Sequence, residues 1–257
     1  RMGFPALYMT GYGVVASSFG LPDAGLASYT EMVDRVKTIA AGTLTPLIAD
    51  GDTGYGGLLN VQRTVRGYEQ AGAGAIQLED QKIPKKCGHT PNRRVIPVDD
   101  MVAKIRVAVA ARESENFLVI ARTDARTQYG LAEAIGRGQA FAKAGADVVF
   151  VEAPESVDEM IEICREIDGP LMANMVNGGK TPLLSAEELK DLGYQIVIFP
   201  GTALLAAGSA VQSVYQHLKA TGSSRGLPTP LYDFEEFNRL MGFEEVWAFE
   251  KKWTDPS

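Results

Sequence analysis

Seven short, nearly continuous apolar runs, separated by longer amphipathic segments, constrain the fold of this chain more than any other feature. A continuous apolar run is typical of a parallel strand buried on both faces, whereas a half-exposed strand alternates apolar and polar residues. The runs lie at residues 6–9, 46–49, 75–78, 118–121, 148–151, 171–173 and 196–199. Their alternation with helical segments predicts βα units around a parallel sheet.

Helix boundary signals support this interpretation. Ser28 and Glu31 fit a capping box, in which two side chains satisfy free backbone N–H groups, and the same spacing recurs at Ser156/Glu159 and Ser185/Glu188. Glycine recurs where a helix ends and the next apolar run begins, as at Gly72, Gly145 and Gly193.

The fold class that fits best is a (β/α)8 TIM barrel, which typically needs about 250 residues. The chain has 257 residues but seven apolar runs, and it opens on Arg1, so we expect the first strand to lie upstream. An open doubly wound sheet is the alternative. No Gly-rich nucleotide fingerprint follows the first run, which disfavours it.

Two further helices are predicted after the last run, at residues 203–219 and 234–252. A Gly-, Ser- and Pro-rich stretch at 221–230 separates them and predicts a linker. The last helix carries enough aromatic residues to pack on a partner subunit. We therefore interpret 1–257 as one barrel domain, with 221–257 as linker and oligomerisation helix.

Composition excludes several classes of protein. A net charge of −7 argues against a nucleic-acid partner, and the absence of any run of about 18 apolar residues argues against a membrane span. No signal-peptide pattern opens the chain. Two distant cysteines, Cys87 and Cys164, do not form a disulfide framework, so a reducing cytoplasm is the expected compartment.

Polar residues directly follow most of the apolar runs. Because barrel enzymes place their chemistry at the carboxyl ends of the strands, we expect these residues to share one site. They are Tyr8, Thr10, Asp50, Asp52, Glu79, Asp80, Arg122, Asp124, Glu152, Asn174, Pro200 and Thr202.

Asp50-Gly51-Asp52 supplies two hard oxygen donors beside a flexible turn. With Glu79 and Glu152 on neighbouring strands, this pair is suited to Mg2+, which prefers oxygen ligands and keeps several waters. Mn2+ takes the same ligands. The alternative is that both aspartates cap loop N–H groups. The spacing of an EF-hand is absent, since its fifth and twelfth positions fall on Gly54 and Val61.

Lys85-Lys86-Cys87-Gly88-His89 forms a polar loop beyond the third apolar run. Two ammonium groups and an imidazole lower the pKa of a thiol, so Cys87 is a candidate for proton transfer near neutral pH. A surface thiol in a charged loop is the alternative. A zinc site is disfavoured because the sequence has no second Cys or His pair. His217, which lies far along the chain, is predicted to be a surface residue. Cys164 lies in a segment with helical periodicity and is predicted to be a buried structural thiol.

Three further residues have both a functional and a structural interpretation. Arg122 suits bidentate binding of a substrate carboxylate, or a structural ion pair with Asp50, Asp124 or Glu152. Asn174 is suited to hydrogen-bond a substrate carboxylate, or alternatively the backbone of a neighbouring loop. Tyr8 is a proton-transfer candidate only with a depressed pKa, and otherwise a core tyrosine.

Together these residues resemble the isocitrate lyase/phosphoenolpyruvate mutase superfamily. The matching segments, which span almost the whole chain, are residues 7–11, 50–56, 77–81, 85–89, 121–125 and 173–175. The Lys-Lys-Cys-Gly-His loop resembles the lyase branch, because the phosphonate-forming mutases have no catalytic cysteine there. This resemblance favours carbon–carbon cleavage over phosphoryl migration.

The resemblance implies a barrel whose last helix is swapped between subunits of a homotetramer. It implies Mg2+ near Asp50, Asp52, Glu79 and Asp80, mostly through water, bound to the 2-hydroxy carboxylate half of a small carboxylic acid. The backbone around Thr10 and Gly11 would help stabilise the oxyanion.

The resemblance also implies roles in bond cleavage. Tyr8 would remove the hydroxyl proton, and Cys87, on a closing loop, would protonate the departing carbanion. His89 and Lys86 would tune the thiol. The remaining substrate contacts would come from Gly88, Arg122, Glu152, Asn174 and Pro200.

The resemblance leaves the substrate open. Phe150 and Pro200 resemble residues in the substrate pocket of those members that release pyruvate. This resemblance favours a 2-methyl substrate of the 2-methylisocitrate or 2,3-dimethylmalate type. Asn177 stands where many relatives carry Glu, which bears on recognition of the departing acid. Oxaloacetate hydrolysis, a phosphonopyruvate-type phosphonomutase and a catalytically silent barrel are the alternatives.

Overall fold

The computed structural model describes residues 2–88 and 93–254. The chain divides into two compact units, Pro5–Leu204 and a second one made of Arg1–Phe4 with Leu205–Ser257. The boundary therefore falls before the predicted linker at 221–230, near the start of a long helix. The interpretation of 1–257 as a single domain stays a prediction.

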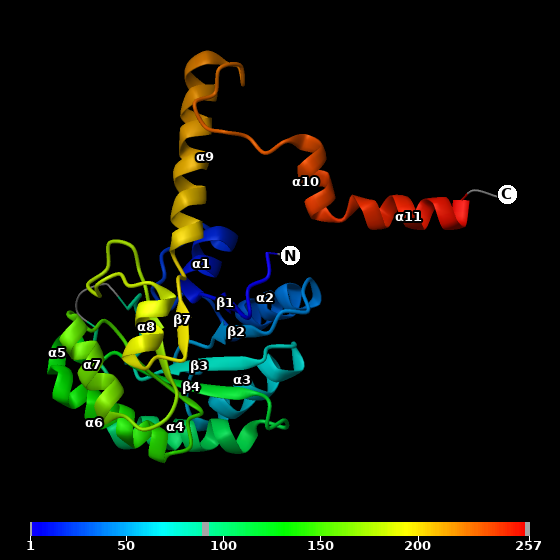
Figure 1. Cartoon of the computed structure of the whole chain (residues 1–257). Coiled ribbons are helices and arrows are strands. Elements are labelled where there is room, and N and C mark those ends of the chain that lie inside the picture. The colour runs from blue at the N-terminus through cyan, green and yellow to red at the C-terminus, as the bar shows by residue number, and fades with distance from the viewer. Residues whose placement is uncertain (1, 89–92, 255–257) are drawn as a thin grey trace. The chain divides into compact units, whose positions relative to one another are not determined.

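Seven parallel strands form one sheet in sequence order, as expected for successive βα units, and helices surround them (Figure 1). The result is a nearly closed TIM-barrel-like fold, which confirms the predicted fold class. The strands are β1 (Leu7–Met9), β2 (Leu47–Asp50), β3 (Ala75–Glu79), β4 (Leu118–Thr123), β5 (Val148–Val151), β6 (Leu171–Asn174) and β7 (Ile196–Ile198).

Several strands extend beyond their apolar runs into the polar residues that follow. Asp50, Glu79 and Asn174 are the last residues of β2, β3 and β6, and β4 continues through Arg122 to Thr123. Backbone pairing along a parallel ladder continues regardless of side-chain polarity, and this explains the difference from the predicted ends. These side chains are thus held by the rigid sheet rather than by loops.

Two apolar layers follow from the alternation of side chains along each strand. The barrel interior contains Ile48, Ala75, Ile120, Val148, Phe150, Met172 and Ile198. Alternate residues such as Ala49, Ile76 and Val119 pack outward, in a core shared with the helices. Any polar residue an even number of positions after an interior residue therefore also points inward.

The helices of the barrel unit begin largely where their capping signals predict. Ser28 and Ser185 form complete capping boxes, and Ser156 accepts from the Glu159 N–H. The helical elements are α1 (Gly11–Val14), a π-helical turn (Val15–Phe19), α2 (Tyr29–Ala41), α3 (Leu58–Gln70), α4 (Val98–Ala111), α5 (Arg126–Tyr129), α6 (Leu131–Lys143), α7 (Val157–Glu166) and α8 (Ala186–Leu192).

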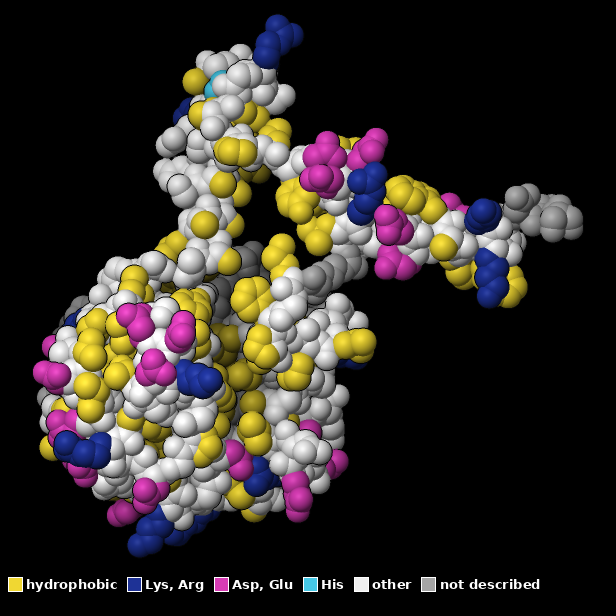
Figure 2. Space-filling view, viewed as in Figure 1, with side chains coloured by type: hydrophobic (Ala, Val, Ile, Leu, Met, Phe, Trp, Pro, Cys, Tyr) yellow, Lys and Arg dark blue, Asp and Glu magenta, His cyan; other side chains and the backbone are white. Residues whose placement is uncertain are grey.

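The second unit contains α10 (Phe234–Met241) and α11 (Phe243–Thr254), and α9 (Thr202–Thr221) runs into it from residue 202. The single helix predicted at 234–252 is wrong, because Gly242 adopts a left-handed conformation (φ 96°) that ends α10. Apolar side chains line α10 and α11 and are exposed (Figure 2). Within the described ranges, no helix is long and apolar enough to cross a membrane.

Candidate active site

The polar residues predicted to share a site converge at the carboxyl end of the sheet. Asp50 pairs in register with Gln77, and Glu79 pairs with Arg122. Each lies an even number of residues from an interior apolar residue of its own strand, and so does Asn174. The alternation of the strands therefore places these side chains inside the mouth of the barrel.

Asp50 is fixed by donors on both of its carboxylate oxygens. The Asp52 N–H donates to Oδ1 at 3.0 Å, and the Gly11 N–H donates to Oδ2 at 3.0 Å. The N–H of Gly11, predicted to stabilise a substrate oxyanion, is thus already used to orient Asp50. The capping alternative considered for the aspartate pair holds for Asp50, whose carboxylate accepts loop N–H groups.

Asp52 lies beside a buried ammonium group. Lys85 Nζ contacts Asp52 Oδ1 and lies 2.6 Å from Asp23 Oδ1, and all three side chains are at most 8% exposed. Burial raises the pKa of Asp52 to about 7, although Lys85 opposes the shift. Burial would lower the pKa of Lys85, but Asp52 and the nearby Glu79, Asp50 and Asp23 outweigh it and raise that pKa.

A hydrated divalent cation fits this acidic cluster. The Lys85 ammonium group interacts with four carboxylates, those of Asp23, Asp50, Asp52 and Glu79. Glu79 Oε1 is buried and has no hydrogen-bond partner. Among the described residues, no three His, Cys, Asp or Glu side chains stand at direct metal-ligand geometry. Because Mg2+ prefers oxygen ligands and keeps several of its waters, these carboxylates are compatible with Mg2+ held mostly through water.

Asp80 differs from the other predicted metal residues. Its carboxylate accepts from the Thr123 hydroxyl at 2.7 Å and the Asp124 N–H at 2.9 Å, and it pairs with Arg137 at 3.1 Å. One residue after Glu79, it points to the opposite face of the sheet, toward α6. The geometry does not support the metal-binding role predicted for Asp80, which instead anchors β3 to β4 and α6.

Arg122 is held within a network of carboxylates. Its Nε and Nη2 bind both oxygens of Asp124 at 3.0 and 2.9 Å, and Nη2 lies 3.3 Å from Glu152 Oε2. The structural ion pair considered for Arg122 is therefore present. The guanidinium also lies over the Phe150 ring. The third guanidinium nitrogen, Nη1, lies 3.6 Å from Glu79 Oε2 and faces the acidic cluster.

Asn174 reaches the same network from β6. Its Nδ2 donates to Glu152 Oε2 at 3.1 Å, while its Oδ1 is buried without a hydrogen-bond partner. A buried acceptor of this kind is costly unless a ligand or water donates to it. Pro200 follows β7 at the same end of the sheet. Its contact with the substrate stays a prediction.

The thiol loop, residues 85–88, lies against the site. A Cβ atom at Gly88 would come within 2.2 Å of Arg122 Nη2 and 3.1 Å of Glu152 Cδ, so the loop backbone touches both side chains. The Cys87 N–H donates to the Asp23 carbonyl at 3.2 Å. Lys86 is half-buried, and His89 lies outside the described residues. The structure thus brings Cys87 to the barrel mouth.

Tyr8 is the middle residue of β1, and its hydroxyl donates to Gln77 Oε1 at 2.7 Å. Burial, and then Asp50, raise the pKa of Tyr8 well above its usual value. This direction is opposite to the depressed pKa that a base needs. In this state Tyr8 is a neutral phenol. Thr10 caps α1 only through its extended backbone.

Residues Asp23, Gln77 and Lys85 complete the site but were not predicted to be part of it. Asp23 lies in the loop between the π-helical turn and α2, and no apolar run precedes it. Gln77 is in the middle of an apolar run, where only its even spacing from Ala75 indicates an inward side chain. Lys85 was predicted only as one of the two ammonium groups that lower the pKa of the Cys87 thiol, and not as a partner of Asp23 and Asp52.

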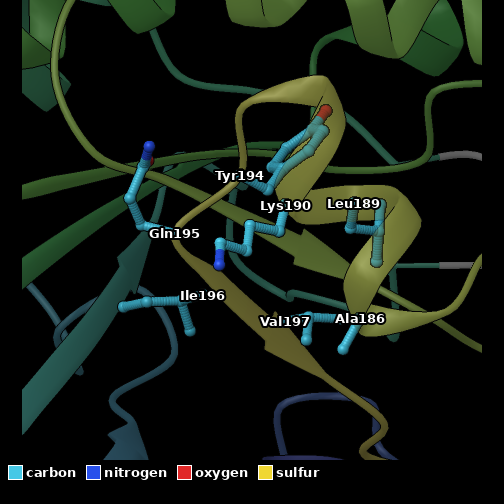
Figure 3. Close-up of a pocket in the computed structure, with 7 residues that line it drawn as sticks. All are labelled: Ala186, Leu189, Lys190, Tyr194, Gln195, Ile196 and Val197. Atoms are coloured by element: carbon cyan, nitrogen blue, oxygen red, sulfur yellow. The ribbon is translucent and has the colours of Figure 1, made fainter.

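A separate pocket of about 450 Å3 lies between α8 and β7, lined largely by apolar atoms (Figure 3). None of the predicted site residues lines it. Tyr194, one of its lining residues, interacts with Cys164, and burial raises the pKa of that thiol to about 11. Cys164 is half-buried rather than fully buried, and it lies apart from the barrel mouth.

A nearly closed parallel barrel with an acidic cluster, a guanidinium and a thiol loop at its carboxyl end defines a barrel enzyme. A model of the phosphoenolpyruvate phosphomutase family matches residues 1–219. The chain therefore belongs to the PEP mutase/isocitrate lyase superfamily, which confirms the predicted family.

Two similar relatives are carbon–carbon lyases. The chain is 47% identical to 2,3-dimethylmalate lyase of Eubacterium barkeri over 99% of its own length and 88% of that protein. It is 42% identical to 2-methylisocitrate lyase of Aeropyrum pernix, over 98% and 80%. These relatives identify the chain as an enzyme of the carbon–carbon lyase type.

Solved structures of related enzymes share the fold. Oxaloacetate acetylhydrolase bound to 3,3-difluorooxalacetate superposes with a TM-score of 0.92 at 34% identity, covering 99% of this chain and 87% of that one. Phosphonopyruvate hydrolase with oxalate and Mg2+ gives 0.85 at 32% identity, over 98% and 88%. Mg2+ is thus a cofactor within the superfamily.

Proposed function

We propose that this chain is a Mg2+-dependent lyase that cleaves a 2-hydroxy dicarboxylic acid of the 2,3-dimethylmalate type to pyruvate and a second carboxylic acid. The observation that carries the proposal is the docked thiol loop. Gly88 touches Arg122 and Glu152, and Lys85 lies between Asp23 and Asp52. A proton donor thus lies beside a site for a cation and a carboxylate.

The chain's own residues provide the carboxylate contacts. Arg122 is fixed by Asp124 and presents Nη1 toward the cluster, and Asn174 presents a buried carbonyl and amide. Glu152 bridges the two, so it orients both side chains. A substrate carboxylate would replace Glu79 as the nearest partner of Arg122 Nη1.

Asp50 and Asp52, with Asp23 and Glu79, would hold Mg2+, and Mn2+ is the alternative ion for the same oxygens. When bound, the cation would bind the 2-hydroxy carboxylate end and stabilise negative charge that develops there. Tyr8 lies beside this end and is bound to Gln77. Its role as a base requires the bound ligands to lower its pKa, which burial raises.

Cys87 would donate the proton that the departing carbanion needs after the carbon–carbon bond breaks. Lys85 and Gly88, which lie on either side of the half-buried Cys87, are docked against the site. Exclusion of water by this loop would make the carbanion take its proton from the protein. Lys86 and His89, which flank it in sequence, would tune the pKa of the thiol.

The substitution Cys87→Ser tests the proton-donor role. We expect Mg2+ and substrate binding to persist in a calorimetric titration, while turnover of 2,3-dimethylmalate falls at least about 100-fold, because a hydroxyl is a far weaker acid than a thiol. Cys164→Ser is the control, because Cys164 interacts with Tyr194 away from the site. Full turnover by Cys87→Ser would refute the role.

Oxaloacetate hydrolysis is the second candidate, favoured by the superposition with oxaloacetate acetylhydrolase. A panel of 2,3-dimethylmalate, 2-methylisocitrate, isocitrate, oxaloacetate and phosphonopyruvate, assayed with Mg2+, separates the candidates. Pyruvate from the 2-methyl acids supports the proposal, with the preferred acid deciding between dimethylmalate and methylisocitrate types. Oxalate and acetate from oxaloacetate would support the hydrolase instead, and turnover of phosphonopyruvate alone would indicate phosphonomutase chemistry.

We also propose a homotetramer that acts in the cytoplasm. The exposed aromatic residues of α10 and α11 support association with further copies of the chain, as a swapped helix would require. No disulfide joins Cys87 and Cys164 in the described residues, which is compatible with a reducing compartment.

A further inference from the structure

The side chain of Gln81 binds the backbone of the thiol loop one residue before Cys87. Its Nε2 donates to the Lys86 carbonyl at 2.8 Å, and its Oε1 accepts from the Lys86 N–H at 3.0 Å. Both polar groups of the Lys86 backbone are therefore paired with one amide. Gln81 is 2% exposed, so water competes little for these bonds.

Gln81 itself is held by the barrel rather than by the loop. It follows β3 directly after Glu79 and Asp80, and its backbone pairs with Val95 in an isolated antiparallel bridge. The adjacent Asp80 is fixed by Thr123 and Arg137. The amide of Gln81 is thus a rigid extension of the sheet that reaches the loop.

Two independent contacts then determine where the thiol lies. Gln81 fixes the peptide groups on either side of the Lys86 Cα atom, and the Asp23 carbonyl accepts the N–H of Cys87. With the backbone bonded at two consecutive residues, the peptide group that leads into Cys87 is held in one orientation. Lys85, held by Asp23 and Asp52, secures the preceding residue.

We infer that Gln81 is a positioning residue whose amide sets the backbone of the thiol loop so that Cys87 faces the reacting carbon. This inference rests on the proposed function, in which Cys87 donates a proton. Gln81 itself does not contact the substrate. Its effect is transmitted through the Lys86 backbone and therefore concerns the proton-transfer step rather than substrate or metal binding.

The chain contains a matched control for this arrangement. The amide of Gln195 also bonds to the backbone at both ends. Its Oε1 accepts from the N–H of Leu171, the first residue of β6, at 2.7 Å, and its Nε2 donates to the Gly193 carbonyl at the end of α8 at 2.8 Å. It lines the separate pocket between α8 and β7 (Figure 3). Gln195→Met thus removes the same bonds away from Cys87.

The experiment compares Gln81→Met with Gln195→Met in the full-length protein with Mg2+ and 2,3-dimethylmalate. For Gln81→Met we expect kcat to fall about 100-fold, as a misplacement of about 1 Å can cause, while KM changes by less than about twofold. Hydrogen exchange at the Cys87 amide, resolved by mass spectrometry, is expected to become faster. Gln195→Met is expected to change neither quantity.

A folded Gln81→Met protein with the unaltered kcat and unaltered Cys87 exchange would overturn the inference. Faster exchange with unchanged kcat would support positioning by Gln81 and would count against the proton-donor role of Cys87 instead. If Gln81→Met does not fold, exchange in the unaltered protein decides. Protected Lys86 and Cys87 amides support the inference, and exchange at the rate of an open loop overturns it.

Discussion

At the scale of single residues, the burial of Asp52 has a consequence for the cation binding that we propose. Burial raises the pKa of Asp52 to about 7, although the adjacent Lys85 favours the charged form. Below this pH the carboxyl group of the metal-free protein carries a proton, which a cation must displace. Above it the group is already ionised, so the affinity for Mg2+ rises with pH through about 7 and then levels off.

The affinity for Mg2+ is therefore expected to fall as the pH drops from 8 to 6, approaching about tenfold per pH unit below the pKa, with release of a proton on binding. Calorimetric titration with MgCl2 at several pH values, in buffers of different ionisation enthalpy, measures both quantities. A dissociation constant that stays the same between pH 6 and pH 8 would contradict this assignment.

Gly88 is a second residue at which a small change is expected to have a large effect on activity, because it has no side chain where the loop meets Arg122. A Cβ atom there would lie 2.2 Å from Arg122 Nη2, and Arg122 is held in place because Asp124 binds its Nε and Nη2. Gly88→Ala is expected to keep the loop from docking and to lower kcat/KM about 100-fold, the effect of a misplaced catalytic group.

Steady-state kinetics on Gly88→Ala measures this effect, and Gly136→Ala is the control. Gly136 lies inside α6, and no heavy atom lies within 4 Å of a Cβ added there. That variant is expected to keep its activity and to gain about 0.5–1 kcal/mol of stability, because glycine disfavours helix interiors. Equal activity of the two variants would show that the loop does not need close contact.

At the scale of elements, the segment that follows β2 has an unusual backbone conformation at and after Asp52, one of the aspartates that we propose hold Mg2+. Asp52 and Tyr55 have positive φ values of 49° and 56°, which cost about 1–3 kcal/mol each in residues other than glycine. Contacts from other elements compensate. Tyr68 of α3 donates to the Asp50 carbonyl at 3.1 Å, and Lys104 of α4 donates to the Thr53 carbonyl at 2.8 Å.

Tyr68→Phe is expected to lower the free energy of unfolding by about 1 kcal/mol, the net value of a buried hydrogen bond, and to weaken Mg2+ binding several-fold. Chemical denaturation and calorimetry measure the two effects. Tyr194→Phe is the matched control, because its buried hydroxyl interacts with Cys164 away from the site. Equal Mg2+ affinities for both variants would show that Tyr68 supports only the fold.

At the scale of the whole molecule, association is the expected role of the second unit. Phe237, Trp247 and Phe249 are exposed along α10 and α11, and side chains of this size rarely stay in water without a partner. Trp247→Glu is therefore expected to shift a tetramer toward smaller species. Light scattering after size-exclusion chromatography measures this. Lys251→Gln, with the same change in charge on α11, is expected to remain tetrameric.

Much of the barrel unit could be predicted from the order of apolar runs, because burial on both faces of a parallel strand leaves a continuous signal in sequence. Asp50, Glu79, Arg122 and Asn174 were predicted as site residues because each directly follows such a run. Asp80 comes one residue after Glu79 and was predicted with it, and yet it points to the other face. Only the two-residue alternation along β3, and the contacts with Thr123 and Arg137, distinguish it.

The sequence by itself determined the parallel βα architecture, the family and the chemical types at the strand ends, because these depend on local periodicity and on motifs within short segments. The tertiary structure decided which side chains meet. Asp23 reaches Lys85 across 62 residues, and Gln81 reaches a loop that no periodicity describes. Such contacts depend on how loops return to the sheet, and local propensities do not encode that path.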